Sequence, residues 1–492
     1  MMTKQMRWPL KIGDVTQMKP FCSIIAAVLI SAGLWACAPF APAPRAPGKE
    51  MVPSAYSDTA PETENVQRWW ETFNDDQLNA LVEEALANNY SLQQSWARLK
   101  QARVLAVISG AQRYPALNLG SDASVTRRRV SDGQSASTDT VEVYSVGLSS
   151  SYEVDLWGRI RSEKEAATLS AEASREDLNA AAVTLTANVA SRWIGVLSQR
   201  MQKQLLERQL EANITLEELV ELRFRKSLAS ALDVFQQRQL VAQSRSQIPL
   251  VERSERQLLN ELALLLGRTP FRIPQITSQA FEIPAQVPAT GLPVQLLTAR
   301  PDIQGAMRRL EAADWNVASA KADRLPRLDL SAGATYQAQE LNLLWDNWLL
   351  NLVGTITAPL LDGGRRKAEV QRLEAVVEEN LAAYRQTILA AVQEVEDALV
   401  GEEKLQAHLE ALQTQLDAAK NALNEARSRY RSGLSDYLPV LTQLVTVQNL
   451  ERTTIQRKAD LLVARVNLHR ALGGTWVQQP RVSGTGVAKA PQ

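Results

Sequence analysis

The spacing of hydrophobic residues along this chain predicts long helices that alternate with β-hairpins. Between residues 76 and 113, apolar side chains recur every three to four positions, which is the period of an amphipathic helix. Pro115 follows and ends this pattern. The segments 117–126 and 145–156 alternate apolar and polar residues instead, and this two-residue period predicts strands. The polar, turn-rich stretch 127–140 is expected to link them as a hairpin.

A second helical pattern runs from residue 159 to 225 without a proline and almost without glycine. At 1.5 Å per residue, about 67 helical residues extend roughly 100 Å. A turn at 226–230 leads to a further helix of about 35 residues, which ends at the capping residue Gly267. The two shorter helices together match the long one in length. We therefore expect them to stack end to end along it, with their junction halfway.

The same order of elements occurs twice, because the chain repeats itself. A shift of 206 residues places segment 223–229 on 429–435 and Leu266-Gly267 on Leu472-Gly473. The second copy again has two alternating segments, a long helical pattern over 364–431 and a turn at 432–436. Each copy should therefore contribute one hairpin with strands of about 10–14 residues.

The first 36 residues have the features of a secretory signal peptide. Basic residues precede an apolar stretch from Phe21 to Ala36. The sequence Leu34-Trp35-Ala36-Cys37 resembles a bacterial lipobox, so Cys37 is the predicted lipidation site. An ordinary signal peptide with an incidental cysteine is the alternative. The proline-rich residues that follow Cys37 predict an extended tether.

These patterns divide the chain into six parts. They are a lipoprotein signal peptide (1–36), a lipid-anchored extended segment (37–75), a first repeat (76–267), an inter-repeat linker (268–292), a second repeat (293–473) and a C-terminal tail (474–492).

Composition and charge exclude several classes of protein. The chain has 54 Lys and Arg against 54 Asp and Glu, so a strongly basic nucleic-acid-binding protein is excluded and no nucleic-acid partner is expected. Two cysteines and two histidines leave little room for a disulfide scaffold or a zinc site. The sequence has no P-loop, dinucleotide fingerprint or nucleophile elbow. We therefore expect neither an enzyme nor a bound cofactor or metal.

Four alternating strands per chain imply assembly. An open sheet leaves unpaired edges, and in lipid only helices and closed barrels satisfy the backbone. Four strands are too few to enclose a lumen, whereas three chains would supply twelve. Soluble hairpins packed on helices are the alternative. The long helices are expected to pack side by side in a closed cylinder, with an ordinary coiled coil as the alternative.

The chain resembles TolC-like outer-membrane efflux proteins, in particular the OprM- or NodT-like lipoprotein branch that serves resistance-nodulation-division (RND) pumps. The resemblance rests on the lipobox and on the doubled helix–hairpin–helix–helix plan, together with three short motifs: Trp69-Trp70-x-x-Phe73, Arg429-Tyr430-x-x-Gly433 and Leu472-Gly473. It implies a mainly α fold with a transmembrane β-barrel. This fold is a TolC-like trimeric α/β-barrel with two internal repeats per chain and four strands per protomer in a twelve-stranded barrel.

The resemblance also implies a function. By this resemblance, the protein is expected to be the outer-membrane channel component of a tripartite efflux pump. As such it would form a trimeric trans-periplasmic exit duct for small molecules such as drugs. The implied partners are two further copies of the chain in a homotrimer, a periplasmic adaptor (membrane fusion) protein, an inner-membrane RND transporter and outer-membrane lipid. The implied location is the outer membrane of a Gram-negative cell, with a lipid anchor and an extension into the periplasm. The alternatives are a type I secretion duct and a periplasmic helical scaffold without a pore.

A gate is expected at the helix–helix turns. Members of this family narrow at these turns through links among Tyr, Arg and Asp side chains. By similarity, Tyr430 stands at the aromatic position of that network and Asp233 at an acidic position of the first copy, and Arg429 is a further candidate. Helix-end capping or plain surface charge is the alternative for each.

The sequence departs from the family pattern close to this gate. Pro439 and Thr442 stand where acidic residues form rings in the best-known family member. Asp436 lies close by and is the candidate substitute. Rings of charge select ions through their local field, so this departure leaves cation binding at the gate open.

Overall fold

The computed structural model describes residues 39–45, 48–56, 68–131, 136–272, 274–283 and 293–474. The predicted signal peptide and Cys37 lie outside these residues, as does nearly all of the predicted tail. The chain divides into two compact units, which we describe separately. A strand unit contains residues 104–168 and 311–377, and a helical unit contains 45–103, 169–310 and 378–492.

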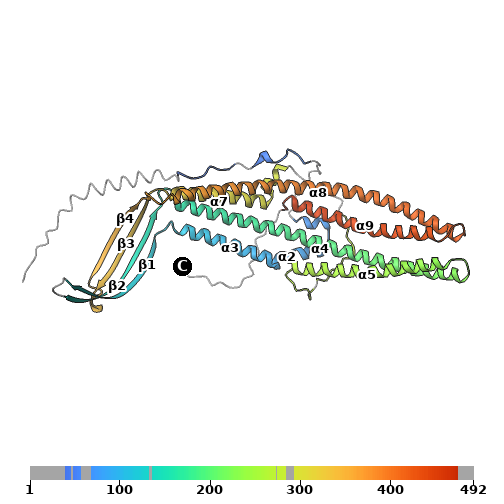
Figure 1. Cartoon of the computed structure of the whole chain (residues 1–492), viewed down its shortest axis with the longest axis horizontal. Coiled ribbons are helices and arrows are strands. Elements are labelled where there is room, and N and C mark those ends of the chain that lie inside the picture. Colours follow the sequence, from blue (N-terminus) through green and yellow to red (C-terminus); the bar gives the residue numbers. More distant parts are fainter. Residues whose placement is uncertain are drawn as a thin grey trace, which may run out of the picture. The chain divides into compact units, whose positions relative to one another are not determined.

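The elements follow one another in the same order in each half of the chain (Figure 1). After the short helices η2 (Lys49–Met51) and η3 (Trp69–Phe73), the first half has α2 (Asp76–Asn88), α3 (Tyr90–Ala111), β1 (Ala116–Ser131), β2 (Ala136–Val154), α4 (Arg159–Arg225) and α5 (Ala231–Leu265). The second half has η4 (Pro293–Gln295), α6 (Leu296–Ala299), α7 (Pro301–Ala322), β3 (Arg327–Ala338), η5 (Leu341–Leu343), β4 (Trp348–Thr357), α8 (Arg365–Arg431) and α9 (Leu438–Ala471).

Both long helices form as the sequence predicts, with 67 residues each. A carboxylate caps the N-terminus of each one. Asp155 accepts a hydrogen bond from the backbone N–H of Ile160 at 3.1 Å, and Asp362 accepts one from Arg366 at 3.1 Å. Such caps satisfy amide groups that the first helical turn leaves without a partner.

The helix predicted over residues 76–113 is wrong in one respect, because it is broken at Asn89. Asn89 has extended backbone angles, and its side-chain oxygen accepts a hydrogen bond from the backbone N–H of Leu92 at 3.0 Å. An asparagine side chain competes in this way with the helical ladder and begins a new helix. The apolar spacing continues through the break, so periodicity alone does not reveal it.

The predicted link between the first two strands is also wrong. Residues 127–140 are mostly strand, because β1 continues to Ser131 and β2 begins at Ala136. The two strands have 16 and 19 residues, more than the 10–14 expected. Backbone pairing supports this extension, for example between Arg127 and Thr140. Pairing between strands does not require apolar side chains, so a polar sequence can remain in a sheet.

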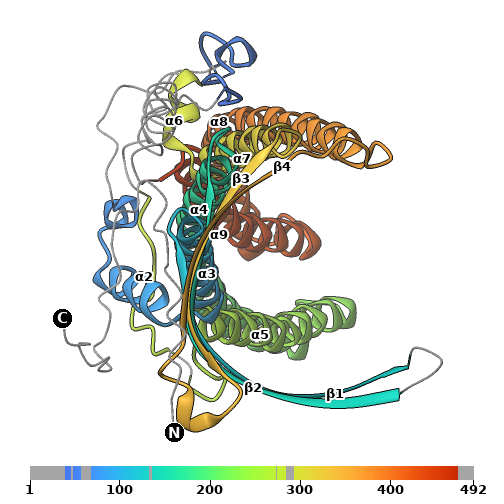
Figure 2. The same ribbon diagram turned by 90° about the vertical axis from the view of Figure 1, so that its left-hand side faces the viewer.

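The four strands form one antiparallel sheet in the order β1-β2-β3-β4, which curves strongly in Figure 2. Leu119 pairs with Leu148, which pairs with Ala334, which in turn pairs with Leu350. Residues paired in this way point to the same side of the sheet. The predicted apolar positions therefore gather on one surface, which we call the apolar face: Leu117, Leu119, Ala123, Val125, Tyr144, Val146, Leu148, Leu328, Leu330, Tyr336, Trp348, Leu350, Leu352 and Ile356.

The apolar face is uncovered in a single chain. Leu352 is 81% exposed and Ile356 74% exposed. Within the described sheet, the outer edges of β1 and β4 have no partner strand. A contiguous apolar surface of this kind on a protein indicates a membrane or a partner.

In the helical unit, α4 lies beside α5 and α8 beside α9 (Figures 1 and 2). The shorter helices meet end to end, as the sequence predicts. The Asn89 side chain donates to the Leu265 carbonyl oxygen at 2.9 Å, and Arg300 donates to that of Ala471 at 2.9 Å. Gly267 has a φ of +70°, and a Cβ there would collide with the backbone oxygen of Asn88. Glycine is therefore required at this junction.

Two large clusters of buried residues lie in the described part of the helical unit. One surrounds Trp193 and includes Trp69 and Trp70. The other lies among α4, α5, α8 and α9 and includes Val220, Leu423 and Val440. Among the described residues, α4 is the one helix long and apolar enough to cross a membrane. Because 61% of its apolar window is buried inside the protein, we assign α4 to the core.

Candidate functional site

The two helix–helix turns have the same local construction. The N–H of Leu228 donates to the carbonyl oxygen of Arg223 at 2.8 Å, and that of Leu434 donates to the carbonyl oxygen of Arg429 at 2.9 Å. In each turn one residue takes a positive φ, namely Ser227 at 57° and Gly433 at 73°. These bonds satisfy carbonyl groups at the helix ends. Both turns therefore reverse the chain sharply next to the candidate gate residues.

Asp233 takes part in a capping box at the start of α5. Its N–H donates to Ser230 Oγ at 3.1 Å, and its carboxylate accepts from the Ser230 N–H at 2.8 Å. This arrangement matches the capping alternative that the sequence left open. Burial raises the pKa of both Tyr430 and Tyr437, and the negative charge of Asp233 raises the pKa of both phenols further. Asp233 therefore belongs to the cluster around Tyr430.

Tyr430 is the centre of this cluster. Its side chain is only 7% exposed, and its ring lies 5.3 Å from the ring of Tyr437. The guanidinium carbon of Arg223 lies 4.4 Å from the Tyr430 ring centroid, within the range of a cation–π interaction. Burial raises the pKa of Tyr430, so the phenol is neutral at physiological pH. Because Arg223 comes from α4 and Tyr430 from α8, this contact joins the two halves of the chain.

A buried hydrogen-bond network continues from Tyr437. Tyr437 Oη donates to Gln237 Oε1 at 2.6 Å, and Gln237 Nε2 donates to the carbonyl oxygen of Asn213 at 2.7 Å. Gln448 Nε2 donates to Asn213 Oδ1 at 2.8 Å, and Asn213 Nδ2 donates to Ser244 Oγ at 2.9 Å. Such networks fix one arrangement of the helices, because separating them would leave buried polar atoms without partners.

The structure does not bring all predicted gate residues together. Arg429 and Asp436 are exposed, and within the described part of the chain neither forms an ion pair. Pro439 and Thr442 are also exposed. Arg223, which the duplication shift aligns with Arg429, was not among the residues predicted for the gate. The alignment of the two repeats could have identified Arg223 as a gate candidate, because the two arginines hold equivalent positions in the repeats.

A buried ion pair connects α8 and α9 at another level of the helical unit. Arg465 donates to Glu402 Oε1 at 2.9 Å, and both side chains are only 6% exposed. The second carboxylate oxygen of Glu402 is buried without a hydrogen-bond partner among the described residues. Burial raises the pKa of Glu402, and the charge of Arg465 opposes that rise. The carboxylate therefore depends on this one arginine.

His469 lies against Trp69, with ring centroids 5.1 Å apart and an interplanar angle of 20°. Burial, helped by the positive charge of Arg465, lowers the pKa of His469 to about 4. His469 therefore packs against Trp69 in the core of the helical unit. His408 is exposed.

Acidification should destabilise the protein through His469. Its folded-state pKa lies below the value of about 6.5 in the unfolded chain, so the unfolded state binds the proton more tightly. We expect a loss on the order of 3 kcal/mol as the pH falls from about 6.5 to 4. The difference in unfolding free energy between wild type and His469→Phe, which keeps a ring against Trp69, measures this contribution. A difference that does not change over this pH range would contradict the assignment.

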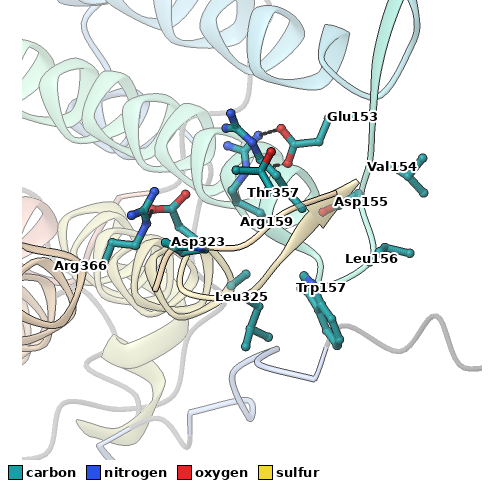
Figure 3. Close-up of a pocket in the computed structure, with 13 residues that line it drawn as sticks. Glu153, Val154, Asp155, Leu156, Trp157, Arg159, Asp323, Leu325, Thr357 and Arg366 are labelled. Atoms are coloured by element: carbon teal, nitrogen blue, oxygen red, sulfur yellow. Dashed lines mark hydrogen bonds and ion pairs between the residues drawn. The ribbon is translucent and has the colours of Figure 1, made fainter. Parts of the chain in front are cut away.

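The strand unit has a cavity of about 90 Å³ where β2 and β3 meet the starts of the long helices (Figure 3). Arg159 donates to both oxygens of Glu153, at 3.0 and 2.7 Å, and Arg366 donates to Asp323 at 2.9 Å. The indole N–H of Trp157 donates to the carbonyl oxygen of Pro326 at 2.6 Å. Because its charges are already paired, we interpret this cavity as a structural joint between strands and helices. In the described part of the chain, no group of three or more metal-ligating side chains could hold an ion.

Comparison with known proteins agrees with this architecture. The sequence model of the family described as "Outer membrane efflux protein" matches residues 81–268 and 292–474. The pyoverdine export outer membrane protein OpmQ of Pseudomonas putida is 33% identical over 456 residues, which cover 91% of this chain and 96% of OpmQ. The outer membrane protein OprJ of Pseudomonas aeruginosa is 31% identical over 461 residues, which cover 92% of this chain and 96% of OprJ.

Solved structures show the same fold. The outer-membrane channel OprN superimposes with a TM-score of 0.82 at 28% identity, over 88% of this chain and 98% of OprN. The outer membrane protein VceC of Vibrio cholerae gives a TM-score of 0.77 at 29% identity, over 84% of this chain and 99% of VceC. With four strands in one sheet, paired long helices and matches over most of its length, this chain belongs to the outer membrane efflux protein family.

Proposed function

We propose that this protein is the outer-membrane channel component of a tripartite efflux pump, and that three copies form a trans-periplasmic exit duct for small molecules. The observation that carries this proposal is the apolar face. It continues across all four strands and is exposed in one chain, while the edges of β1 and β4 are open. In lipid such edges must pair. Pairing β4 of one copy with β1 of the next would close a barrel of twelve strands.

The two faces of the sheet support this arrangement. The apolar face would contact lipid, and the opposite face, which carries Asn118, Asp122 and Ser149, would line a polar lumen. Tyr144, Tyr336 and Trp348 would lie at the membrane interface, where aromatic side chains are enriched. The two repeats, 76–267 and 293–473, would then each contribute one hairpin to the wall of the duct.

The proposed partners are a periplasmic adaptor protein and an inner-membrane RND transporter, with Cys37 as the lipid-anchored residue. Named relatives include a toluene efflux protein and an antibiotic efflux protein of Pseudomonas putida, besides the pyoverdine export protein. These names favour small molecules over unfolded proteins as cargo. A duct of this kind carries out no reaction, since the pump would supply the energy.

We further propose that Tyr430, Arg223 and Asp233 close the periplasmic end of this duct. Their contacts lie beside the two helix–helix turns and join the two halves of each chain. Separating the helix pairs would break both the cation–π contact of Tyr430 with Arg223 and the hydrogen bond of Tyr437 with Gln237.

Deleting the gene should raise the cellular accumulation of a fluorescent pump substrate severalfold, and the full-length gene should restore efflux. The purified protein should form detergent-resistant trimers that give single-channel currents in planar bilayers. Loss of a secreted protein with unchanged accumulation would instead favour the type I secretion duct. A monomer without currents would favour the helical scaffold.

A further inference from the structure

The far end of β1 carries three consecutive arginines, Arg127, Arg128 and Arg129, all of them exposed. Among the described residues, none of the three forms an ion pair. β1 begins just after α3 and β2 ends just before α4, so these arginines lie at the end of the hairpin remote from those helices. The pairing of β2 with β3 begins only at Tyr144. This end of the hairpin therefore projects beyond β3 and β4, as Figure 2 shows.

The register divides the three arginines between the two faces of the sheet. Arg127 and Arg129 have the same parity along β1 as Leu119 and Val125, so they extend the apolar face. Arg128 has the opposite parity. It lies on the polar face, where its partner in the strand register is Asp139. Two of the three cations thus share a face with the residues that would contact lipid.

Their distance along the strand places them in a headgroup layer. From Leu117 to Val125 the apolar stripe extends about 27 Å along β1, enough for a tilted strand to cross the hydrocarbon layer. Tyr144 pairs with Ala123 and marks the aromatic row at this end. Arg127 and Arg129 follow Val125 directly on the same face. Their guanidinium groups would thus lie just outside the hydrocarbon layer.

We propose that Arg127 and Arg129 form a binding site for the phosphate groups of the glycolipid in the outer leaflet of the outer membrane. A guanidinium group can donate two parallel hydrogen bonds to one phosphate. The residues paired with the two arginines, Thr140 and Thr138, present hydroxyl groups on the same face. Glu142, also on this face, pairs with Val125 in the strand register and accepts a hydrogen bond from Tyr144 Oη at 3.1 Å.

This inference goes beyond the efflux function, and it does not depend on the gate. It requires only that the sheet crosses the membrane with the β1–β2 turn on the outer side. Each arginine whose side chain reaches the anionic headgroups contributes a factor of about 5.4 to the affinity, so two contribute about 30-fold.

The test uses the full-length trimer in a non-ionic detergent, titrated with bis-phosphorylated lipid A. The affinity of Arg127→Gln/Arg129→Gln should be about 30-fold weaker than that of wild type. Arg128→Gln is the matched control, because it removes the same charge from the other face, and its affinity should stay within about twofold. Dephosphorylated lipid A should bind wild type as weakly as lipid A binds the double variant. Equal affinities of wild type and the double variant, or an equal loss in Arg128→Gln, would overturn the proposal.

Two further ligands distinguish the source of the phosphate. Phosphatidylglycerol dispersed in the same detergent and inorganic phosphate should each bind much more weakly than lipid A, and a match by either would overturn the assignment to the glycolipid. If the glutamine variant does not assemble, Arg127→Lys/Arg129→Lys keeps the charge and should bind severalfold more weakly, because lysine cannot form the bidentate contact. Full affinity of this lysine variant would also count against the site. Its unchanged single-channel conductance would show that the duct is intact.

Discussion

Replacement of Arg465 by methionine is expected to lower the free energy of unfolding by about 3–5 kcal/mol, because it leaves the Glu402 carboxylate buried without its cation. Both side chains are almost wholly buried, and the second oxygen of Glu402 has no hydrogen-bond partner among the described residues. Water therefore cannot replace the lost contact without opening the α8–α9 pair. Chemical unfolding of the detergent-solubilised protein, followed by far-UV circular dichroism, measures this loss.

Glu402→Gln/Arg465→Met is the control that separates charge from packing. It removes both charges, so most of the lost stability should return. The Arg465→Met deficit should also shrink as the pH is lowered. Burial raises the pKa of Glu402, and without Arg465 the folded state would bind a proton still more tightly than the unfolded state. A single variant as stable as wild type at neutral pH would show that the pair contributes little.

Tyr430→Ala is expected to raise the single-channel conductance of the trimer severalfold. The substitution removes the ring that contacts both Arg223 and Tyr437, and with it the cation–π contact between the two halves of the chain. The remaining buried network then has to hold the helix pairs together alone. Conductance in planar bilayers at neutral pH is the measurement.

Tyr430→Phe distinguishes the ring from the hydroxyl group. The Tyr430 hydroxyl is buried without a hydrogen-bond partner among the described residues, so phenylalanine should keep the duct closed. Arg223→Gln, which removes the cation, should open it as Tyr430→Ala does. If phenylalanine opens the duct as alanine does, the hydroxyl group and not the cation–π contact closes it.

For Asp233 the matched control is Ser230→Ala. Ser230→Ala breaks the capping box but keeps the Asp233 charge, whereas Asp233→Ala removes both. Only Asp233→Ala should raise the conductance if the carboxylate acts in the gate. Equal effects of the two variants would reduce Asp233 to a helix cap. Unchanged conductance in both Tyr430→Ala and Asp233→Ala would remove these residues from the gate.

The sequence by itself determined the elements whose signals are local. The uninterrupted helical pattern over 159–225 predicted α4 to the residue, and the two-residue alternation predicted which side of each strand is apolar. Both signals come from the regular geometry of the backbone, which gives side chains a period of about 3.6 residues in a helix and about 2 in a strand. The duplication supplied the second half of the fold in the same way. A comparison of the shorter helical patterns with the length of α4 also predicted that the shorter helices meet end to end.

The tertiary structure decided which distant residues meet. The contact of Arg223 with Tyr430 spans more than 200 positions, and the buried pair of Glu402 and Arg465 spans 63. Asn89 breaks a helix that its neighbours would continue, and Arg127 stays in a strand that its polarity argues against. In each case the partner is far away in sequence or is a backbone group. At these positions, local propensity contributes less to the free energy of folding than a hydrogen bond or a charge pair that forms only when the chain has folded.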